Sequence, residues 1–408
     1  MSSQGEESSN GRKVLIIVEN LPVPHDKRPW QEAKSLTAAG YKVAVISPKG
    51  HGSNASYEVI DGVSIYRHSL PVEARSGTAY ILEYGWAFVC EVLLTWKVKF
   101  HHGFDVIQAC NPPDNIYLIA LMFRAFFGTK FIFDHHDGNP ELWLARGGSR
   151  GLVFSALSYL ERRSFRAAQA SLAVNDHYAG IARDRGGMDR DAVFTVRNAP
   201  GREMVQHTME NIGKASKSNR SRCVVGYLGV MGKQDSVDNF LRIIDFIVND
   251  RGREDLEFRI MGNGPELVSL KNLVVELSIE KWVTFTGWVS GDAYVDNLSS
   301  CDICVNADEV NNYNMHCSPN KVYEYMLFAK PIVQFSMPES RLVADEAALY
   351  ALENDNEDFA DRIIELADDP ERRVAMGKLG HARFLESFTW DNSERELLKA
   401  YEYVFNLD

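Results

Sequence analysis

The chain has 408 residues, of which 45% are hydrophobic and 25% are charged, and these values are those of an ordinary globular protein. Its length exceeds what one hydrophobic core usually supports, so it predicts two domains of about 200 residues each. The formal net charge of −12 excludes a broad nucleic-acid surface, which would need clustered Lys and Arg, and no nucleic-acid partner is expected.

Six cysteines in a chain of this length do not form a disulfide framework. Cys301 and Cys304 are interpreted as buried thiols of a strand rather than as a metal or redox pair. The first twelve residues are polar and lack the apolar core of a signal peptide, and no apolar run reaches about 18 residues. These features predict a cytoplasmic protein. The aromatic segment 81–100 is interpreted as a core helix, with a helix on the inner membrane surface as the alternative, which leaves peripheral membrane association open.

Short apolar runs alternate with longer helical patterns through the first half of the chain, as in a parallel sheet with crossover helices. Helices are expected at 29–39, where Gly40 is the stop signal, and at 116–127. The expected strands are Lys13–Val18, Lys42–Ile46, Asp105–Cys110, Lys130–Asp134, Ser171–Val174 and Val193–Val196.

The polar stretch 206–222 interrupts this alternation and is the clear linker candidate. The alternation then resumes, and an amphipathic helix is expected at 389–405. The expected strands of this half are Val224–Leu228, Glu257–Met261, Val283–Thr286, Ile303–Asn306 and Pro331–Gln334. The pattern predicts an α/β protein with two doubly wound domains, whose ligands bind at the carboxyl ends of the strands, in the cleft between the domains.

The segment that begins at Ser318 is the most informative stretch of the chain. A polar turn, Ser318-Pro319-Asn320, leads into a short helix, whose first turn offers free backbone N–H groups and a positive dipole end to an anion such as a diphosphate. Lys321 adds a cation, and Glu324 lies about one turn further, where its carboxylate can accept hydrogen bonds from ribose hydroxyls. An ordinary helix start with a surface Lys and Glu is the alternative.

Three strand ends of the second half carry turn residues that suit a close approach of a ligand to the main chain. They are the stretches 229–233, with Gly229 and Lys233, 262–264, with Asn263 and Gly264, and 287–289, with Trp288 and Val289. Each alone is more often a simple turn. Together with the helix start at Ser318 they predict a nucleotide pocket.

Other motifs in the chain fail. The segment 229–234 is too short for a P-loop and has Gln234 where Ser or Thr is needed. The third glycine of a dinucleotide fingerprint after 262–264 is replaced by Leu267. Asp189-Arg190-Asp191 matches an Asp-x-Asp pattern, but so short a pattern is common by chance. No His, Cys or Asp cluster has the spacing of metal ligands, so no metal site is expected.

In the first half, the strand 131–133 ends in Asp134-His135-His136-Asp137. An imidazole there could hydrogen-bond a sugar hydroxyl or a developing phosphate charge, steered by a neighbouring carboxylate. A capped turn with surface histidines is the alternative. The first loop, 20–28, carries Asp26 and Arg28 and suits acceptor contacts, and Asn198 ends another strand and could line the same site.

Taken in order, these residues make the chain resemble a retaining glycosyltransferase of the GT-B fold and family 4 type, and the resemblance covers nearly its whole length. The matching segments are Asp26-Lys27-Arg28, His136-Asp137, Arg197-Asn198, Gly262-Asn263-Gly264-Pro265, Gly287-Trp288-Val289 and Phe388-Thr389-Trp390. The combination in this order is specific, although no single piece is.

Two departures from the family pattern stand out. The first Glu of the family's Glu–seven residues–Glu motif is His316 here, and the second is Glu324. A subset of the family has the Pro-Asn-Lys form seen at 319–321. The Arg that the family places near Gly229 is also missing, and Lys321, beside Lys233, is expected to supply the charge for the diphosphate.

The resemblance implies a fold and a domain arrangement. The fold is GT-B: two Rossmann-like domains that face a central cleft, with the last helix crossing back to the N-terminal domain. The implied divisions are a disordered start at 1–12, an N-terminal acceptor domain at 13–203, a linker at 204–222, a C-terminal nucleotide-sugar-binding domain at 223–387 and a C-terminal helix at 388–408.

The resemblance also implies an activity: transfer of a sugar from a UDP- or GDP-linked donor to a hydroxyl, with retained anomeric configuration and without a metal or other cofactor. His136 and Glu324 are the implied catalytic residues. The donor residues are Gly229, Lys233, Asn263, Gly264, Trp288, Val289, His316, Ser318, Pro319, Asn320, Lys321 and Glu324, and the acceptor residues are Asp26, Arg28, Asp137 and Asn198.

The expected partners are a nucleotide sugar and a glycan or lipid-linked acceptor, in polysaccharide or glycolipid assembly. Two alternatives remain from the sequence. One is a sugar-nucleotide epimerase of the same architecture. The other is a non-catalytic nucleotide-sugar binder, which is suggested by His316 in place of the family's Glu.

Overall fold

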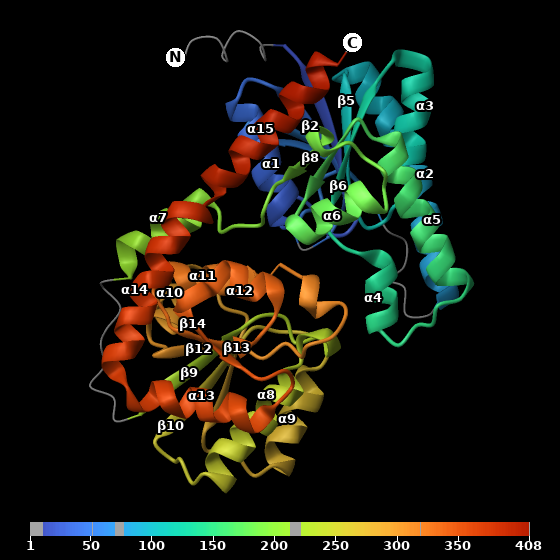
Figure 1. The fold of residues 1–408 in the computed structure, drawn as a ribbon. Coiled ribbons are helices and arrows are strands. Elements are labelled where there is room, and N and C mark those ends of the chain that lie inside the picture. The colour runs from blue at the N-terminus through green and yellow to red at the C-terminus, as the bar shows by residue number, and fades with distance from the viewer. Residues whose placement is uncertain (1–10, 51, 70–76, 213–221, 319, 408) are drawn as a thin grey trace. The chain divides into compact units, whose positions relative to one another are not determined.

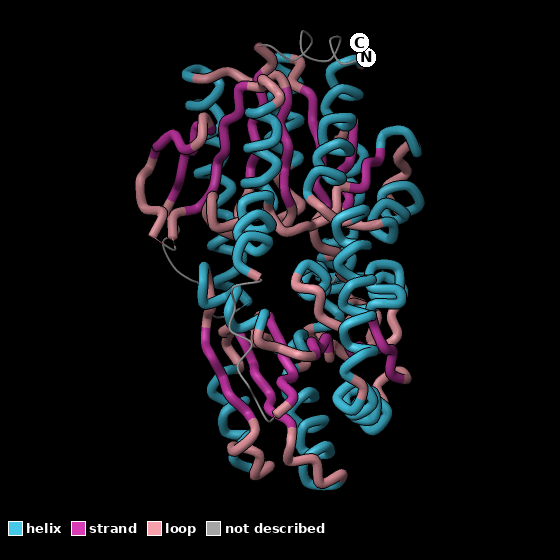
Figure 2. Tube along the Cα trace, turned by 90° about the vertical axis from the view of Figure 1, so that its left-hand side faces the viewer, coloured by secondary structure: helices cyan, strands magenta, loops and turns pink. Residues whose placement is uncertain are grey.

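The computed structural model describes residues 11–50, 52–69, 77–212, 222–318 and 320–407. They form two compact units (Figure 1). The first comprises the described residues up to Asn198 together with those from Asp391 onward, and the second runs from Ala199 to Trp390. In each unit helices lie against the faces of one sheet (Figure 2). Helix α7 (Arg202–Asn211) begins before the segment 204–222, which the sequence predicted as a linker, and extends into it.

The sheet of the first unit has the strand order β3-β4-β2-β1-β5-β6-β7-β8, and every pair is parallel except β3 with β4. Its strands are β1 (Lys13–Ile17), β2 (Lys42–Pro48), β3 (Tyr57–Ile60), β4 (Val63–His68), β5 (Val106–Cys110), β6 (Lys130–His135), β7 (Ala170–Ala173) and β8 (Val193–Thr195). The six strands predicted in this half are confirmed. The hairpin β3–β4 was not predicted.

Helices cover both faces of this sheet. One face carries α2 (Gly77–His101), α3 (Tyr117–Phe127) and α5 (Leu152–Ala167), whose apolar residues share a core with β1, β5 and β6. The other helices before Asn198 are α1 (Lys27–Ala38), α4 (Asn139–Ala145) and α6 (Asp176–Asp184). Among the helices that the structure describes, none combines the length and the apolar character needed to cross a bilayer.

The last helix, α15 (Trp390–Asn406), belongs to the first unit from Asp391 onward. Its Tyr401 is fully buried and donates a hydrogen bond from its hydroxyl to Oε1 of Gln108 on β5, at 2.6 Å. Tyr401 and Phe405 also lie against Tyr41, each with 5.8 Å between ring centroids. The N-terminal fold therefore includes a helix that is far away in the sequence.

The sheet of the second unit has the order β11-β10-β9-β12-β13-β14, and all of its pairs are parallel. Its strands are β9 (Cys223–Leu228), β10 (Leu256–Met261), β11 (Val283–Gly287), β12 (Ile303–Asn306), β13 (Ile332–Phe335) and β14 (Ala348–Ala351). The five strands predicted here are confirmed, and the edge strand β14 was not predicted. Cys301 and Cys304 are buried, as the sequence indicated.

Two cores lie on the two faces of this second sheet. The first core takes apolar residues from α8 (Val237–Asp245), α9 (Leu267–Glu276) and α13 (Asn356–Asp368). The second core takes them from α10 (Gly291–Ser299), α11 (Asn320–Leu327), α12 (Pro338–Ala344) and α14 (Pro370–Ser387). Because all strands are parallel, the loops after β9, β10, β11 and β12 meet at one edge of the sheet.

Candidate functional site

Asp134 lies at the end of β6 and is fully buried. Its Oδ1 accepts a hydrogen bond from Nη2 of Arg28 at 2.8 Å, and its Oδ2 accepts one from Nε2 of Gln108 at 3.0 Å. Burial alone would raise the pKa of Asp134. The charge of Arg28 and the hydrogen bonds from His136 and Arg28 outweigh burial and hold this pKa well below its usual range. Asp134 is therefore an ionised group in the interior.

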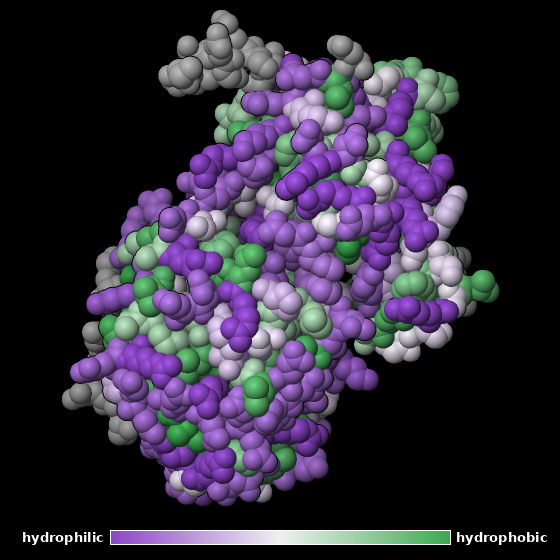
Figure 3. Space-filling model, in the orientation of Figure 1, coloured by the Kyte–Doolittle hydropathy of each residue, from purple (hydrophilic) through white to green (hydrophobic). Residues whose placement is uncertain are grey.

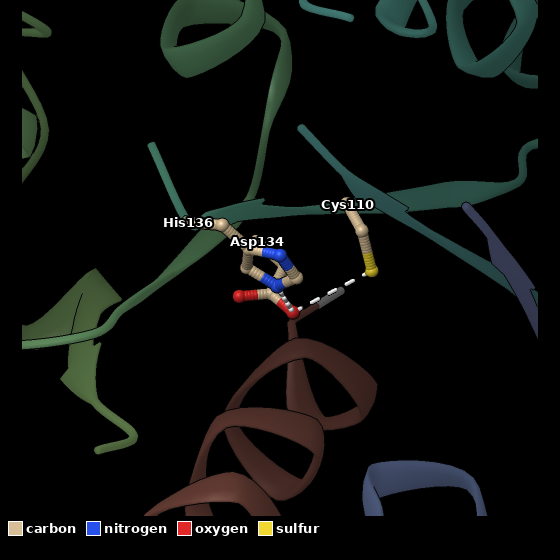
Figure 4. A group of neighbouring side chains, drawn as sticks. All are labelled: Cys110, Asp134 and His136. Atoms are coloured by element: carbon tan, nitrogen blue, oxygen red, sulfur yellow. Dashed lines mark hydrogen bonds and ion pairs between the residues drawn. The ribbon is translucent and has the colours of Figure 1, made fainter. Parts of the chain in front are cut away.

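His136 is held by this carboxylate. Its Nε2 lies 2.7 Å from Oδ2 of Asp134 (Figure 4). Nε of Arg28 donates to the same Nε2 at 2.9 Å. Nε2 of His136 is thus engaged by both members of the buried Arg28–Asp134 ion pair. The Nδ1 edge of the ring, on a side chain that is 16% exposed, is then the edge left for a ligand.

Around this pair lies a buried polar network. Glu32 on α1 is 3.2 Å from Nε of Arg28, and its Oε2 accepts a hydrogen bond from Nε2 of Gln108 at 2.6 Å. Burial first, and then the charge of Asp134, raises the pKa of Glu32 well above its usual value. The hydroxyl of Tyr401 donates a hydrogen bond to Oε1 of Gln108, so both ends of this amide have a partner. Each residue of this network contacts another of its members, so the network fixes the orientation of His136 from the interior of the protein.

The main chain at His136 is held by Asn111, which follows β5. Its Oδ1 accepts hydrogen bonds from the backbone N–H of His136 at 2.6 Å and of Asp137 at 3.2 Å. Its amide group donates to Oδ1 of Asp114 at 2.9 Å. Burial raises the pKa of Asp114 to about 6, against the lowering effect of hydrogen bonds from Asn139 and Asn111. Sequence analysis missed Asn111 because nothing in its local pattern shows that β5 and β6 are neighbours.

Arg28 requires a correction. It was predicted to contact an acceptor, but it is 7% exposed and its guanidinium is engaged inside the protein. Besides Asp134 and His136, its Nη1 donates to the carbonyl of Val196 at 2.6 Å and to Oδ1 of Asn198 at 3.1 Å. Arg28 therefore positions the other site residues and does not reach an acceptor.

The other predicted acceptor residues of this unit are partly exposed. Asp26 precedes α1, and burial raises its pKa, opposed by the charge of His136. Asp137 follows His136, and burial raises its pKa as well, again opposed by His136. Asn198 accepts a hydrogen bond from Arg28 through Oδ1, so its amide nitrogen does not take part in that contact. The fold thus brings Asp26, Asp137, His136 and Asn198 to one end of this sheet, around Arg28.

One ligand atom each from Cys110, Asp134 and His136 lies within 4.8 Å of the others, which is a spacing that a metal ion could use (Figure 4). The guanidinium of Arg28 already supplies a positive charge to this group. Burial, followed by the charges of Asp134 and Glu32, raises the pKa of Cys110 well above its usual value, so its sulfur stays a thiol. The chemistry of these three residues does not favour a metal here.

In the second unit, the glycine loops after β9, β10 and β11 are joined to one another. The N–H of Gly229 donates to the carbonyl of Met261, and the N–H of Gly262 donates to that of Gly287. A Cβ on Gly262 would lie 1.8 Å from the oxygen of Gly229, and one on Gly264 would lie 2.4 Å from the oxygen of Met231. These two glycines were predicted to let a ligand approach. The structure shows that each is required by the neighbouring loop.

Lys321, in the first turn of α11, is 2.8 Å from Oδ1 of Asp308 and 5.0 Å from the ring centroid of Tyr227. Burial would lower the pKa of Lys321, but the charges of Asp308 and Tyr227 raise it above its usual value. Burial also raises the pKa of Asp235 to about 6, opposed by Lys321. Lys321, the cation predicted to bind the diphosphate, therefore has two acidic neighbours, Asp308 and Asp235, that the sequence analysis missed. Asp308 lies two residues after the end of β12 (Ile303–Asn306), and this strand end was the available signal.

Glu324 lies one turn further along α11, and its Oε2 accepts a hydrogen bond from the hydroxyl of Tyr294 on α10 at 2.6 Å. Burial, followed by the negative charge of Glu324, raises the pKa of Tyr294, so this hydroxyl keeps its proton. The helix itself is anchored by Tyr325, whose hydroxyl accepts from the N–H of Leu228 at 2.9 Å and donates to the carbonyl of Val305 at 3.0 Å. Glu324 is thus held in one orientation at the ends of β9 and β12.

The remaining predicted donor residues surround this helix start. Trp288 follows β11 and is 74% exposed, whereas Val289 is half-buried against the core. Lys233 is exposed in the turn η2 (Lys233–Asp235), and Asn263 hydrogen-bonds the N–H of Gly264. His316 ends the turn η4 (Asn314–His316), and Ser318 accepts a backbone hydrogen bond from Asn320 at 2.9 Å. Pro319 lies outside the described residues.

Both halves of the chain match models of known protein families. Residues 27–199 match the model of a Glycosyl transferase 4-like domain, and residues 222–369 match the model of Glycosyl transferases group 1. Together the two matches cover most of the chain. A comparison with curated proteins finds no match.

Solved structures share the fold over nearly the whole length. Sucrose-phosphate synthase from Thermosynechococcus elongatus superimposes with a TM-score of 0.76 at 13% identity, over 97% of this chain and 99% of that one. HepE of Anabaena, in complex with UDP and glucose, gives 0.70 at 11% identity, over 96% and 99%. WaaG, a glycosyltransferase involved in lipopolysaccharide biosynthesis, gives 0.66 at 12% identity, over 94% and 98%. The chain therefore belongs to the glycosyltransferases of the GT-B fold, with a glycosyl transferase 4-like domain followed by a group 1 domain.

Proposed function

We propose that this glycosyltransferase moves a sugar from a UDP- or GDP-linked donor to a hydroxyl of a glycan or lipid-linked acceptor, with retention of the anomeric configuration. Its place would be in polysaccharide or glycolipid assembly. The observation that carries this proposal is the pair Lys321 and Glu324, which stand one turn apart on α11 at the edge where the loops after β9, β10, β11 and β12 meet.

Each part of a nucleotide-diphosphate sugar finds a suitable group in the second unit. Glu324, oriented by Tyr294, can accept hydrogen bonds from the ribose hydroxyls. The positive dipole end at the start of α11, with Lys321 and the exposed Lys233, favours the diphosphate. Trp288 and Val289, beside Gly287, would meet the base through their main chain. HepE, which binds UDP and glucose, shares this fold, and UDP is therefore the first donor nucleotide to test.

The first unit would act on the sugar and the acceptor. With Nε2 of His136 engaged by Asp134 and Arg28, Nδ1 is available to form a hydrogen bond with a sugar hydroxyl. Asp26, Asp137 and Asn198 would meet the acceptor. Asp134 and Glu32 are fully buried and hydrogen-bonded within the protein, so neither can attack the anomeric carbon.

Retention then fits a reaction on one face of the sugar. The acceptor oxygen forms the new bond to the anomeric carbon as the bond to the diphosphate breaks, and the acceptor proton passes to the leaving phosphate oxygen. A nucleoside diphosphate and the glycosylated acceptor result. No protein nucleophile and no metal are needed for this step, and the role of the protein is to orient the groups and to stabilise the phosphate charge.

A ligand titration tests the donor part of the proposal. Thermal unfolding is followed with UDP, GDP and their sugars, with and without magnesium. A ligand at a hundred times its dissociation constant should stabilise the protein by about 2.7 kcal/mol. Stabilisation by one base without a metal requirement is expected. No stabilisation by any of them would contradict the proposal.

A product assay completes the test. Proton NMR of the new glycosidic bond should show the donor's anomeric configuration. Release of a different sugar nucleotide without an acceptor would indicate an epimerase instead. Donor binding without turnover on any acceptor would indicate a non-catalytic binder, in which His316 replaces a needed carboxylate.

We propose further that the enzyme works at the cytoplasmic face of a membrane. The residues Trp86, Val89, Leu93 and Phe100 of α2 recur at helical spacing and are all more than half exposed. Phe126 and Phe127 of α3 extend this apolar face. Figure 3 shows apolar residues at the edge of the first unit near α3. An exposed face of this kind suits contact with acyl chains, as an acceptor anchored in lipid would require.

A further inference from the structure

A second group of ionisable side chains lies in the first unit, away from His136. Glu19 follows β1, His68 is the last residue of β4, and Glu91 lies in α2. The exposed fractions of these residues are 6%, 6% and 1%. One ligand atom of each lies within 4.8 Å of the other two. Three separate segments therefore bring two carboxylates and one imidazole together inside the protein.

These groups are not satisfied by hydrogen bonds. Both ring nitrogens of His68, Oε2 of Glu19 and Oε1 of Glu91 have no hydrogen-bond partner in the described part of the chain. Nε2 of His68 lies 3.0 Å from Oε2 of Glu19, but the two are not aligned as a donor and an acceptor. A buried polar atom without a partner costs about 1–3 kcal/mol, and a charged one costs more. Four such atoms at one point indicate a missing partner.

The neighbouring cation does not provide this partner. Arg67 is buried beside His68, but Nη2 donates to the carbonyl of Val23 at 2.6 Å and Nη1 donates to that of Ala55 at 3.2 Å. Nη1 also forms an ion pair with Glu58. Burial and the charge of Glu19 raise the pKa of Glu91 well above its usual value, so both carboxylates are ionised together only when a cation lies between them. In that state, with a neutral imidazole, the group of Glu19, His68 and Glu91 carries a charge of −2. A single divalent cation would balance it.

We propose that Glu19, His68 and Glu91 bind one divalent transition-metal ion, of the type of Zn²⁺ or Mn²⁺. Mixed imidazole and carboxylate ligands suit such ions better than Mg²⁺ or Ca²⁺, which prefer oxygen ligands alone. Metal–ligand bonds of about 2.0–2.2 Å place adjacent ligand atoms roughly 3–3.6 Å apart. The 3.0 Å between Nε2 of His68 and Oε2 of Glu19 meets this requirement, and water would complete the coordination.

The ion would have a structural role. Glu19 stands at the start of the loop 20–26, which leads to α1 and so to Arg28, the residue that orients Asp134 and His136. A metal bound to Glu19, His68 and Glu91 would tie the start of this loop to β4 and α2. It would not touch the sugar or the phosphate, so the transfer step itself stays metal-independent.

The main rival to the metal is a proton. A carboxylic acid on Glu91 could donate to Glu19, which would remove one charge and satisfy two oxygens without any ion. Glu91→Gln separates the two cases, because its amide group can also donate to Glu19 but cannot replace a carboxylate ligand. It should therefore abolish metal binding while keeping the packing. Under the proton hypothesis it should leave metal content unchanged and preserve or raise Tm.

The experiment uses the full chain without an affinity tag. The protein is stripped with a strong chelator, exchanged into Zn²⁺, Mn²⁺ or Mg²⁺, and freed of excess metal, after which bound metal and Tm are measured. We expect about one Zn²⁺ or Mn²⁺ per chain, a higher Tm than the stripped protein, and neither effect with Mg²⁺ or in Glu91→Gln. Metal below about a tenth of an equivalent, or equal metal on the wild type and Glu91→Gln, would overturn the proposal.

A spectroscopic reading avoids dependence on the variant. Co²⁺ added to the stripped wild type should give absorption bands in the visible range that disappear when Zn²⁺ is added in competition. Absence of these bands at saturating Co²⁺ also overturns the proposal. As a matched control, Glu58→Gln removes a partly exposed carboxylate near His68 that is not a proposed ligand, and it should leave the metal content unchanged.

Discussion

Nη2 of Arg28 donates to Oδ1 of Asp134 across 2.8 Å, and this contact joins the start of the first helix to the end of β6. The pair is almost fully buried, with side-chain exposures of 8% and 0%. The pair also positions His136, because Oδ2 of Asp134 contacts the imidazole. The orientation of the predicted sugar-contacting residue thus depends on a residue 108 positions earlier.

Asp134→Asn should reduce both activity and stability. Removing one partner of a buried ion pair leaves the other charge uncompensated, which typically costs about 3–5 kcal/mol. His136 would also lose its charged partner, so kcat should fall even at temperatures where the variant is folded. Urea unfolding and donor-saturated turnover check this, with the exposed Asp238→Asn as the control. Wild-type turnover in a folded Asp134→Asn would contradict the role of the pair.

The same pair predicts the pH dependence of stability. The folded pKa of Asp134 is depressed, so its contribution is fully present above the unfolded value near 3.9 and is lost as the pH falls through the folded pKa. The free energy of unfolding of the wild type should therefore fall between about pH 4 and pH 2. The slope over that range should be smaller in Asp134→Asn. Parallel curves for the two proteins would contradict the assignment.

Glu324→Ala should reduce turnover while leaving the fold intact. Loss of charge-assisted hydrogen bonds to a ribose should cost about 1.5–3 kcal/mol, or roughly 10–150-fold in kcat/KM for the donor. Tyr294→Phe removes only the hydroxyl that orients Glu324 and should have a smaller effect. Steady-state kinetics with varied donor, together with Tm, are the measurements. Near-normal kcat/KM in Glu324→Ala would refute the assignment.

Lys321 and Asp308 form a matched pair for mutation. Lys321→Met should weaken donor binding about 10-fold or more, because it removes a cation next to the expected diphosphate. Asp308→Asn leaves that cation in place and should retain or improve donor affinity. Calorimetric titration with the nucleoside diphosphate compares the two. Equal losses of affinity in both variants would show that the ion pair serves the fold alone.

Membrane contact can be tested on α2. Leu93 and Phe100 are 65% and 76% exposed, and their replacement by Ser should not disturb the core. The double variant should sediment less with vesicles of anionic lipid than the wild type does. Leu352→Ser changes a residue of the second unit that is 66% exposed and is the control. If the wild type and the double variant sediment equally, this face is not the contact.

Much of the fold could be predicted from the sequence, because buried parallel strands are continuous apolar runs. The missed strands differ in kind. β3 lies at the sheet edge with half of its residues exposed, and β14 (Ala348–Ala351) is a short edge strand. β3 is not a continuous apolar run, and β14 is apolar but has only four residues.

The chemistry of the candidate site was less accessible. Motifs located His136, Lys321 and Glu324, whereas Gln108, which binds Asp134 and Glu32, has no local signal. Arg28 was recognised as part of a motif, but its burial depends on how the sheet places the ends of β6 and β8 around it, which no local pattern shows. Glu19, His68 and Glu91 are too far apart in sequence to show any ligand spacing. Only the topology brings them together.

The attachment of α15 to the first unit has a consequence for biosynthesis. Tyr401 completes the polar network under His136, but some 200 residues of the second unit are translated between Asn198 and this tyrosine. At about 5–20 residues per second, the first unit waits roughly 10–40 s on the ribosome before its last helix emerges. A chain released early would contain every predicted catalytic residue and still lack the hydroxyl that completes their support. Activity would thus report that synthesis has reached the final helix.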